Sequence, residues 1–475
     1  MNKYKKLAMN TIIFAIGSFG SKILVLLLTY LYTTNISPSD SSTKELLEIT
    51  ANFFIPIFTF SMNEAIIRYG LDKKYSKHEV FTSACCVTLG GLALMFLLSP
   101  LLGLVHFLNY LDGYTILLLV YICTSAFRQL CSQFVRARGM VKLFSLDGIL
   151  ATLTLFIFNV IFISKLGLGV SGFMLSVILS DFCSAIFLFT VAKLHKFLNI
   201  RYFSKHLAKS MLRFSVPLIP TAVMWIITGF SDRLFIRYMT SDKAVLGEAA
   251  AGIYGYATKI PNLISMVSTI FYQAWNMSAI TENGSADRSR FYEKVYSCYQ
   301  SILFIAAAFL VAAVQIITPF FVNTSRFKEY STVYLYTPIL VVAVLFMCFN
   351  QFLSSIYTAT KHTKNSFWTS LAACSTNIIL NIILIKNYGI QGASVATLVS
   401  YAVCYALRIF DARRYVPFRV NHRLFFLNTA VLLALCIVVI KQPMFYPAYL
   451  VCGFVFMAAC NSEAILIMIK KLLKR

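Results

Sequence analysis

The sequence predicts an all-α polytopic membrane protein with about fourteen transmembrane helices. Hydrophobic residues make up 59% of its 475 residues and charged residues only 13%, against about 25% in soluble domains. The mean hydropathy is +0.75. The apolar runs are long and continuous, which is typical of helices, whereas barrel strands alternate over about ten residues. Lysines and arginines gather in the short loops between these runs.

Apolar runs bounded by charged and turn residues give the spans in order. They cover residues 9–34, 44–67, 80–105, 114–135, 145–164, 170–192, 212–238, 248–276, 295–322, 332–357, 365–385, 391–411, 423–441 and 446–469. The first run is preceded by lysines, but it is too long for the core of a signal peptide, so we interpret it as an uncleaved span.

The distribution of Lys and Arg over alternate loops predicts the orientation. One side carries 31 of the 42 basic residues and the other side 8. Arg128 and Arg408 are assigned to loops of the first side, and Lys44 to a loop of the second. By the positive-inside rule, both termini are expected in the cytoplasm.

An internal repeat divides the chain. A shift of 222 residues superposes 127–167 on 349–389 with twelve identities, including the pairs Asn159–Asn381 and Gly167–Gly389. A shift of 220 then pairs Ser180 with Ser400. We therefore predict two pseudo-symmetric six-helix lobes, residues 1–200 and 201–415, followed by two additional spans in 416–475.

Three cations lie inside predicted spans: Lys22, Arg233 and Lys259. Lys22 shares a helical stripe with Ser18, and Lys259 shares one with Gln273. A cation at the centre of a span costs about 2.5–3.5 kcal/mol on insertion scales, so these positions predict a cavity that binds an anion.

Other interpretations of the embedded charges stay open. Lys22 could form a structural ion pair, for example with Asp181, and Lys259 could reach the outer interface. Asp181 is also a candidate for ion coupling. Glu64 and Arg68 are spaced i to i+4, which predicts a helix-end pair at a cytoplasmic gate.

The composition also indicates which functions to exclude. The net charge of +24 comes from loop residues, which argues against nucleic-acid binding. The twelve cysteines show no metal-ligand spacing, so no metal or cofactor is expected. The loops are too short to hold a catalytic module, which predicts a transporter and not an enzyme.

Several segments resemble Wzx-type oligosaccharide flippases of the multidrug/oligosaccharidyl-lipid/polysaccharide exporter superfamily. They are Gly17 to Lys22, Asn63 to Gly70, Gly252 to Ile260 with Gln273 to Trp275, and Gly389 to Ala393. The resemblance implies a two-lobed MATE-like fold in the bacterial inner membrane. It implies movement of undecaprenyl-diphosphate-linked sugars to the outer leaflet through a cation-lined cavity, for O-antigen or capsule synthesis.

Two alternatives follow from the same sequence. A cation-coupled multidrug exporter of the same fold would use a deep carboxylate such as Asp181, and a polysaccharide polymerase or ligase would need a longer outer loop. The expected partners are the lipid-linked sugar, membrane lipids, and possible polymerase or glycosyltransferase partners, with the protein itself a monomer.

Overall fold

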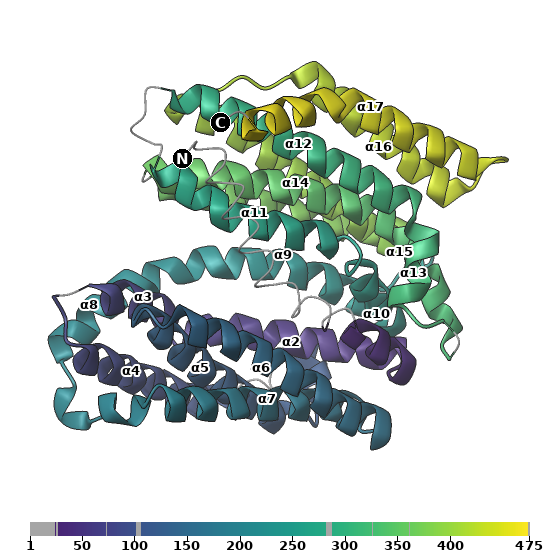
Figure 1. Cartoon of the computed structure of the whole chain (residues 1–475). Helices are drawn as coiled ribbons and strands as arrows, with labels where there is room; N and C mark the ends of the chain where they lie inside the picture. The colour runs from purple at the N-terminus through teal and green to yellow at the C-terminus, as the bar shows by residue number, and fades with distance from the viewer. Residues whose placement is uncertain are drawn as a thin grey trace. The chain divides into compact units, whose positions relative to one another are not determined.

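The computed structural model describes residues 24, 27–72, 74–100, 106–281, 287–324, 326–360 and 362–473. Within these ranges the chain forms helices and no strand, so the predicted all-α class is confirmed (Figure 1). Eight of the described helices are long and apolar enough to cross a membrane, or nine if one bent pair counts as a span. The count of fourteen stays a prediction.

Contacts divide the described part of the chain into two compact units, residues 24–230 and 231–473, and the boundary falls inside one helix. The helices of the first unit are α2 (Pro38–Phe58), α3 (Met62–Leu71), α4 (Lys77–Leu98), α5 (Thr115–Ala137), α6 (Val141–Asn159), α7 (Gly169–Val191), α8 (Lys205–Ser215) and the first part of α9 (Ile219–Tyr238).

A break in the second predicted span separates α2 from α3, and the chain bends by 52° between these two helices. Phe60 and Ser61 have left-handed backbone angles, with φ of 51° and 49°. Helix α4 passes close to this break, because a Cβ built on Gly91 would lie 1.8 Å from the carbonyl oxygen of Phe58. Glycine is therefore required at the crossing.

The N-terminal part of α2 corrects one assignment. Lys44 lies inside the helix and is 3% exposed, so its assignment to a loop is wrong. Its ammonium lies 4.6 Å from the ring centroid of Tyr32, 4.5 Å from that of Phe173 and 3.5 Å from Glu48. These aromatic and acidic neighbours stabilise the ammonium of Lys44 inside the helix, whereas the sequence analysis assigned this residue to a loop.

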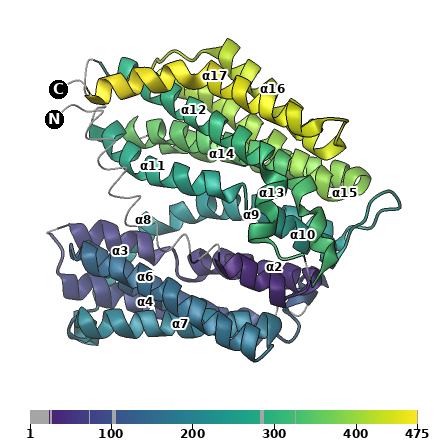
Figure 2. The same cartoon turned by 45° about the vertical axis from the view of Figure 1, so that its right-hand side comes forward.

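The second unit continues with α10 (Glu248–Ala257), α11 (Asn262–Thr281), α12 (Arg288–Ala312), α13 (Val314–Phe321), α14 (Val333–Thr360), α15 (Thr363–Tyr415), α16 (His422–Lys441) and α17 (Tyr446–Leu473). Helices α12, α14, α16 and α17 lie side by side in both views (Figure 2). Their core is rich in aromatic rings. Trp275 is fully buried, stacks on Phe352 at 4.6 Å between ring centroids, and donates a 2.8 Å hydrogen bond to Ser355.

Helix α15 is two antiparallel helices joined at Gly389, whose φ is +58°. Arg408 in the second helix binds Thr369 and Ser370 in the first, so the chain reverses direction at the glycine. The two parts correspond to the predicted spans 365–385 and 391–411.

The partition by contacts differs from the predicted boundaries at residues 200 and 415. The segment after α7 packs on α3 and α4 through α8, and it therefore belongs to the first unit. Helices α16 and α17 share the core of the second unit with α12. The duplication inferred from the sequence stays a prediction.

Candidate functional site

The predicted anion-binding residues are only partly described by the structure. Lys22 and Ser18 lie outside the described residues, and so does the side chain of Gln273 in α11. Arg233 in α9 is half-buried, with its guanidinium carbon 5.7 Å from the ring centroid of Tyr254. Lys259 is half-buried in the break between α10 and α11. Both described cations belong to the second unit.

The predicted gate residues lie on α3. Glu64 is in its first turn and Arg68 in its last, and both side chains are exposed. Among the described residues, no ion pair joins these two side chains, so the predicted helix-end pair is not formed in this structure. An exposed pair of this spacing contributes only about 0.3–0.5 kcal/mol, which does not hold two mobile side chains together.

A carboxylate surrounded by neutral donors lies next to Arg233. Asp232 in α9 is 2% exposed. Its oxygens accept hydrogen bonds from Tyr254 at 2.6 Å, Asn377 at 3.1 Å, Asn381 at 2.6 Å and Thr397 at 2.8 Å. Both helices of α15 and the short helix α10 thus meet at one acid.

This arrangement satisfies the acceptor positions of Asp232 without a paired cation among these four partners. A buried charge is tolerated only when such bonds replace its hydration. On protonation, Asp232 would itself become a donor, and one of its hydroxyl partners, Tyr254 or Thr397, would have to accept instead. Ser231 extends the network by donating a 3.0 Å hydrogen bond to Asn377.

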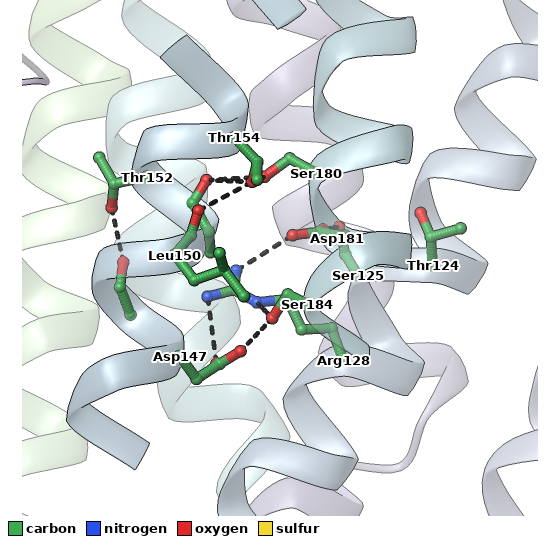
Figure 3. Close-up of polar contacts among 12 residues, drawn as sticks. Thr124, Ser125, Arg128, Asp147, Leu150, Thr152, Thr154, Ser180, Asp181 and Ser184 are labelled. Carbon is green, nitrogen blue, oxygen red and sulfur yellow. Dashed lines mark hydrogen bonds and ion pairs between the residues drawn. The ribbon is translucent and has the colours of Figure 1, made fainter. Parts of the chain in front are cut away.

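The first unit holds a different cluster, centred on Arg128 in α5 (Figure 3). Its guanidinium lies 3.0 Å from Asp181 in α7 and 3.6 Å from Asp147 in α6. The same group donates a 2.9 Å hydrogen bond to Ser184. Ser184 donates in turn to Asp147, and Ser125 donates to Asp181. One cation therefore bridges two carboxylates on neighbouring helices.

This cluster bears on two sequence interpretations. The assignment of Arg128 to a loop is wrong, because it lies nine residues before the end of α5 and contacts buried acids. Asp181 is bound by Arg128 and Ser125. With two carboxylates and one guanidinium, the cluster carries an excess negative charge when both acids are ionised. Ion coupling through Asp181 stays a prediction.

A buried arginine also occupies the second unit. Arg408 is 1% exposed within α15, so its assignment to a loop is also wrong. It donates hydrogen bonds to Thr369 at 2.9 Å, to Ser370 at 2.9 Å and to the carbonyl oxygen of Asn350 at 2.8 Å. These bonds tie α14 to both helices of α15.

With this geometry established, comparisons with known proteins identify the family. Residues 7–276 match the model of a family described as polysaccharide biosynthesis protein. This match covers more than half of the chain. The chain belongs to that family.

One curated relative of this chain is an uncharacterised membrane protein of Methanocaldococcus jannaschii, 27% identical over 274 residues. The match covers 54% of this chain and 61% of that relative, so the chain spans about three fifths of the relative's length.

Solved structures share the fold of this chain. The lipid II flippase MurJ in an inward closed conformation matches with a TM-score of 0.70 and 16% identity, over 98% of this chain and 100% of that one. An inward-facing MATE multidrug transporter matches with a TM-score of 0.64 and 14% identity, over 87% of this chain and 99% of that one. The predicted MATE-like fold is therefore confirmed.

The sequence analysis did not predict the residues that bind Asp232. Asn377, Asn381 and Thr397 lie more than 140 residues after Asp232. These three residues are polar side chains within apolar spans, where polar groups need partners, and this pattern could have marked them as members of a buried network. Asn159 and Asn381 also coincide in the internal repeat.

Proposed function

We propose that this protein is a flippase that moves undecaprenyl-diphosphate-linked oligosaccharide from the cytoplasmic to the outer leaflet of the bacterial inner membrane. It works by alternating access between two lobes and serves surface polysaccharide synthesis. The observation that carries the proposal is the family match over residues 7–276. The fold shared with a lipid II flippase supports a lipid-linked substrate.

The embedded cations suit such a substrate. A diphosphate carries about two negative charges and does not cross hydrocarbon unaided, because its desolvation is too costly. In the proposal, Lys22, Arg233 and Lys259 offset that cost, and Ser18 and Gln273 bind polar groups of the substrate. With the cell interior negative, outward movement of each negative charge gains about 2.3 kcal/mol per 100 mV.

The remaining predicted residues take supporting roles in this proposal. Glu64 and Arg68 line the cytoplasmic gate, where their exposure leaves them free to change partners. Asp181 contributes to ion coupling through its contact with Arg128. Both termini face the cytoplasm, and the protein acts as a monomer.

Alanine substitution tests the cationic pathway in cells that depend on this protein for surface polysaccharide. We expect Lys22→Ala and Arg233→Ala to abolish export while lipid-linked sugar accumulates inside, and Lys259→Ala to reduce it. Lys243→Ala serves as the control, because Lys243 is an exposed cation in the loop after α9. Normal export by the first two variants, at normal abundance in the membrane, would refute the proposed site.

A drug exporter of the same fold is the second candidate. The buried carboxylates Asp181 and Asp232 favour it, because exporters that carry cationic drugs need internal acids, and MATE multidrug transporters share the fold. Deletion of the protein distinguishes the two functions. Loss of surface polysaccharide with unchanged drug susceptibility supports the flippase, and the converse supports the exporter.

A further inference from the structure

A cavity of about 330 Å³ opens at the free ends of the α15 hairpin, within the second unit. It is lined by Asn365, Trp368 and Thr369 from the first helix and by Leu407 and Asp411 from the second. The volume is at the lower end of the range for small-molecule sites. None of these five residues belongs to the transport site proposed above.

The hairpin fixes the depth of the cavity in the bilayer. Thr369 precedes the reversal at Gly389 by 20 residues, and Leu407 follows it by 18. At 1.5 Å per residue these lengths are about 27–30 Å, the thickness of the hydrocarbon core. The cavity therefore lies in a headgroup layer. Trp368 is 63% exposed there, as expected for an interfacial aromatic residue.

The charges of the cavity have both signs. Asp411 is 21% exposed; it accepts a 2.7 Å hydrogen bond from Asn365 and lies 3.8 Å from Arg414. Arg414 is 78% exposed at the rim. Arg408 is buried behind Thr369, to which it donates a hydrogen bond. A ligand with one cationic and one anionic group side by side complements the half-buried Asp411 and the exposed Arg414.

The internal repeat provides a comparison within the same chain. The positions that correspond to Asn365, Trp368, Leu407 and Asp411 are Leu143, Leu146, Phe187 and Val191. All four are apolar. The fold of a helix hairpin therefore does not require an amide, an indole and a carboxylate here. An interfacial tryptophan alone would explain neither Asn365 nor Asp411.

We infer that this cavity binds the headgroup of phosphatidylethanolamine. Its primary ammonium donates hydrogen bonds to Asp411 and lies on the face of Trp368, and its phosphate pairs with Arg414. The headgroup of phosphatidylcholine has the same charges, but its trimethylated nitrogen has no proton to donate. The site thus discriminates by hydrogen bonding and not by charge.

Native mass spectrometry of the full chain in detergent tests this inference. The probes are phosphatidylethanolamine, its N-methylated and N,N-dimethylated forms, and phosphatidylcholine, with matched acyl chains. We expect the first lipid to be retained at about tenfold lower concentration than phosphatidylcholine, since a charge-assisted hydrogen bond is lost, with the methylated forms between. Equal retention of the four lipids by the unmodified protein would overturn the inference.

Variants locate the site. Asp411→Asn keeps the shape of the side chain and should abolish the preference for the primary ammonium. Trp368→Leu installs the residue of the corresponding position and should weaken retention of both lipids about threefold. Glu463→Gln makes the same chemical change at an exposed position of α17 and should leave the preference intact. An undiminished preference in Asp411→Asn would overturn the inference, as would retention of phosphatidylglycerol as tight as that of phosphatidylethanolamine.

Discussion

Each unit holds an arginine within its helices, and the two arginines are bound by different groups. In the first unit Arg128 comes from α5 and contacts two acids, Asp147 and Asp181. In the second unit, the positions of Arg128 and Asp147 are taken by Asn350 and Thr369. The cation there is Arg408, at the position of Leu188, and its neighbours include hydroxyls and a carbonyl.

The two arginines therefore differ in the charge of their partners, which are carboxylates in the first unit and neutral groups in the second. The first unit combines its arginine with acids in one cluster. The second unit keeps its buried acid, Asp232, in a separate cluster of neutral donors. Equivalent substitutions should therefore have unequal effects in the two units.

The largest effect is expected for Asp232→Ala. The change leaves four buried donors without their common acceptor, and at about 1 kcal/mol or more for each it should lower the free energy of unfolding by about 4 kcal/mol. Thermal unfolding of the purified protein in detergent measures the loss. Asp242→Ala, at an exposed loop position, is the control, and an equal melting temperature for both variants would show that the cluster is not stabilising.

The next largest effect is expected for Arg128→Ala. It should lower the free energy of unfolding by about 3 kcal/mol, because two buried carboxylates lose their shared cation. The guanidinium is 28% exposed, so solvent reduces the effect below that of a fully buried pair. Adding Asp181→Asn to this variant should restore part of the stability. If the two losses instead add in the double variant, Arg128 and Asp181 do not interact energetically.

Arg408→Leu sharpens the comparison, since it installs the residue found at the corresponding position of the first unit. We expect a smaller loss of about 2 kcal/mol, because Thr369, which accepts a hydrogen bond from Arg408, keeps the bond that its hydroxyl donates to the carbonyl oxygen of Asn365. The same unfolding measurement applies. A loss larger than that of Arg128→Ala would reverse the ranking of the two clusters.

The sequence was sufficient for the fold class, because long apolar runs admit only helices in a bilayer. It also identified Asp181 as an embedded acid, and the structure places Asp181 in a buried position of α7. It misplaced Lys44, Arg128 and Arg408, since a hydropathy window treats a basic residue near the end of a span as a loop residue. Their burial depends on partners supplied by other helices, such as Phe173 for the first of them.

The hydrogen-bond partners of Asp232 also could not be predicted from the sequence. They come from α10 and from both helices of α15, and only the packing of those helices brings them together. The repeat could have helped, because the pair Asn159–Asn381 marks a polar position kept in both halves. Identity between repeats, however, does not specify which side chain a residue contacts.

The smallest effects are expected at the two corresponding glycines of the hairpin turns. Gly167 and Gly389 have φ of +65° and +58°, which glycine adopts readily, and Gly389 also has ψ of −134°, outside the left-handed helical region open to other residues. A Cβ on Gly167 meets open space, whereas one on Gly389 would lie 3.1 Å from the Cβ of Ala244. Gly389→Ala should therefore destabilise the protein more than Gly167→Ala in thermal unfolding. Equal losses would mean that the backbone angle alone sets the cost and that the neighbouring loop yields freely.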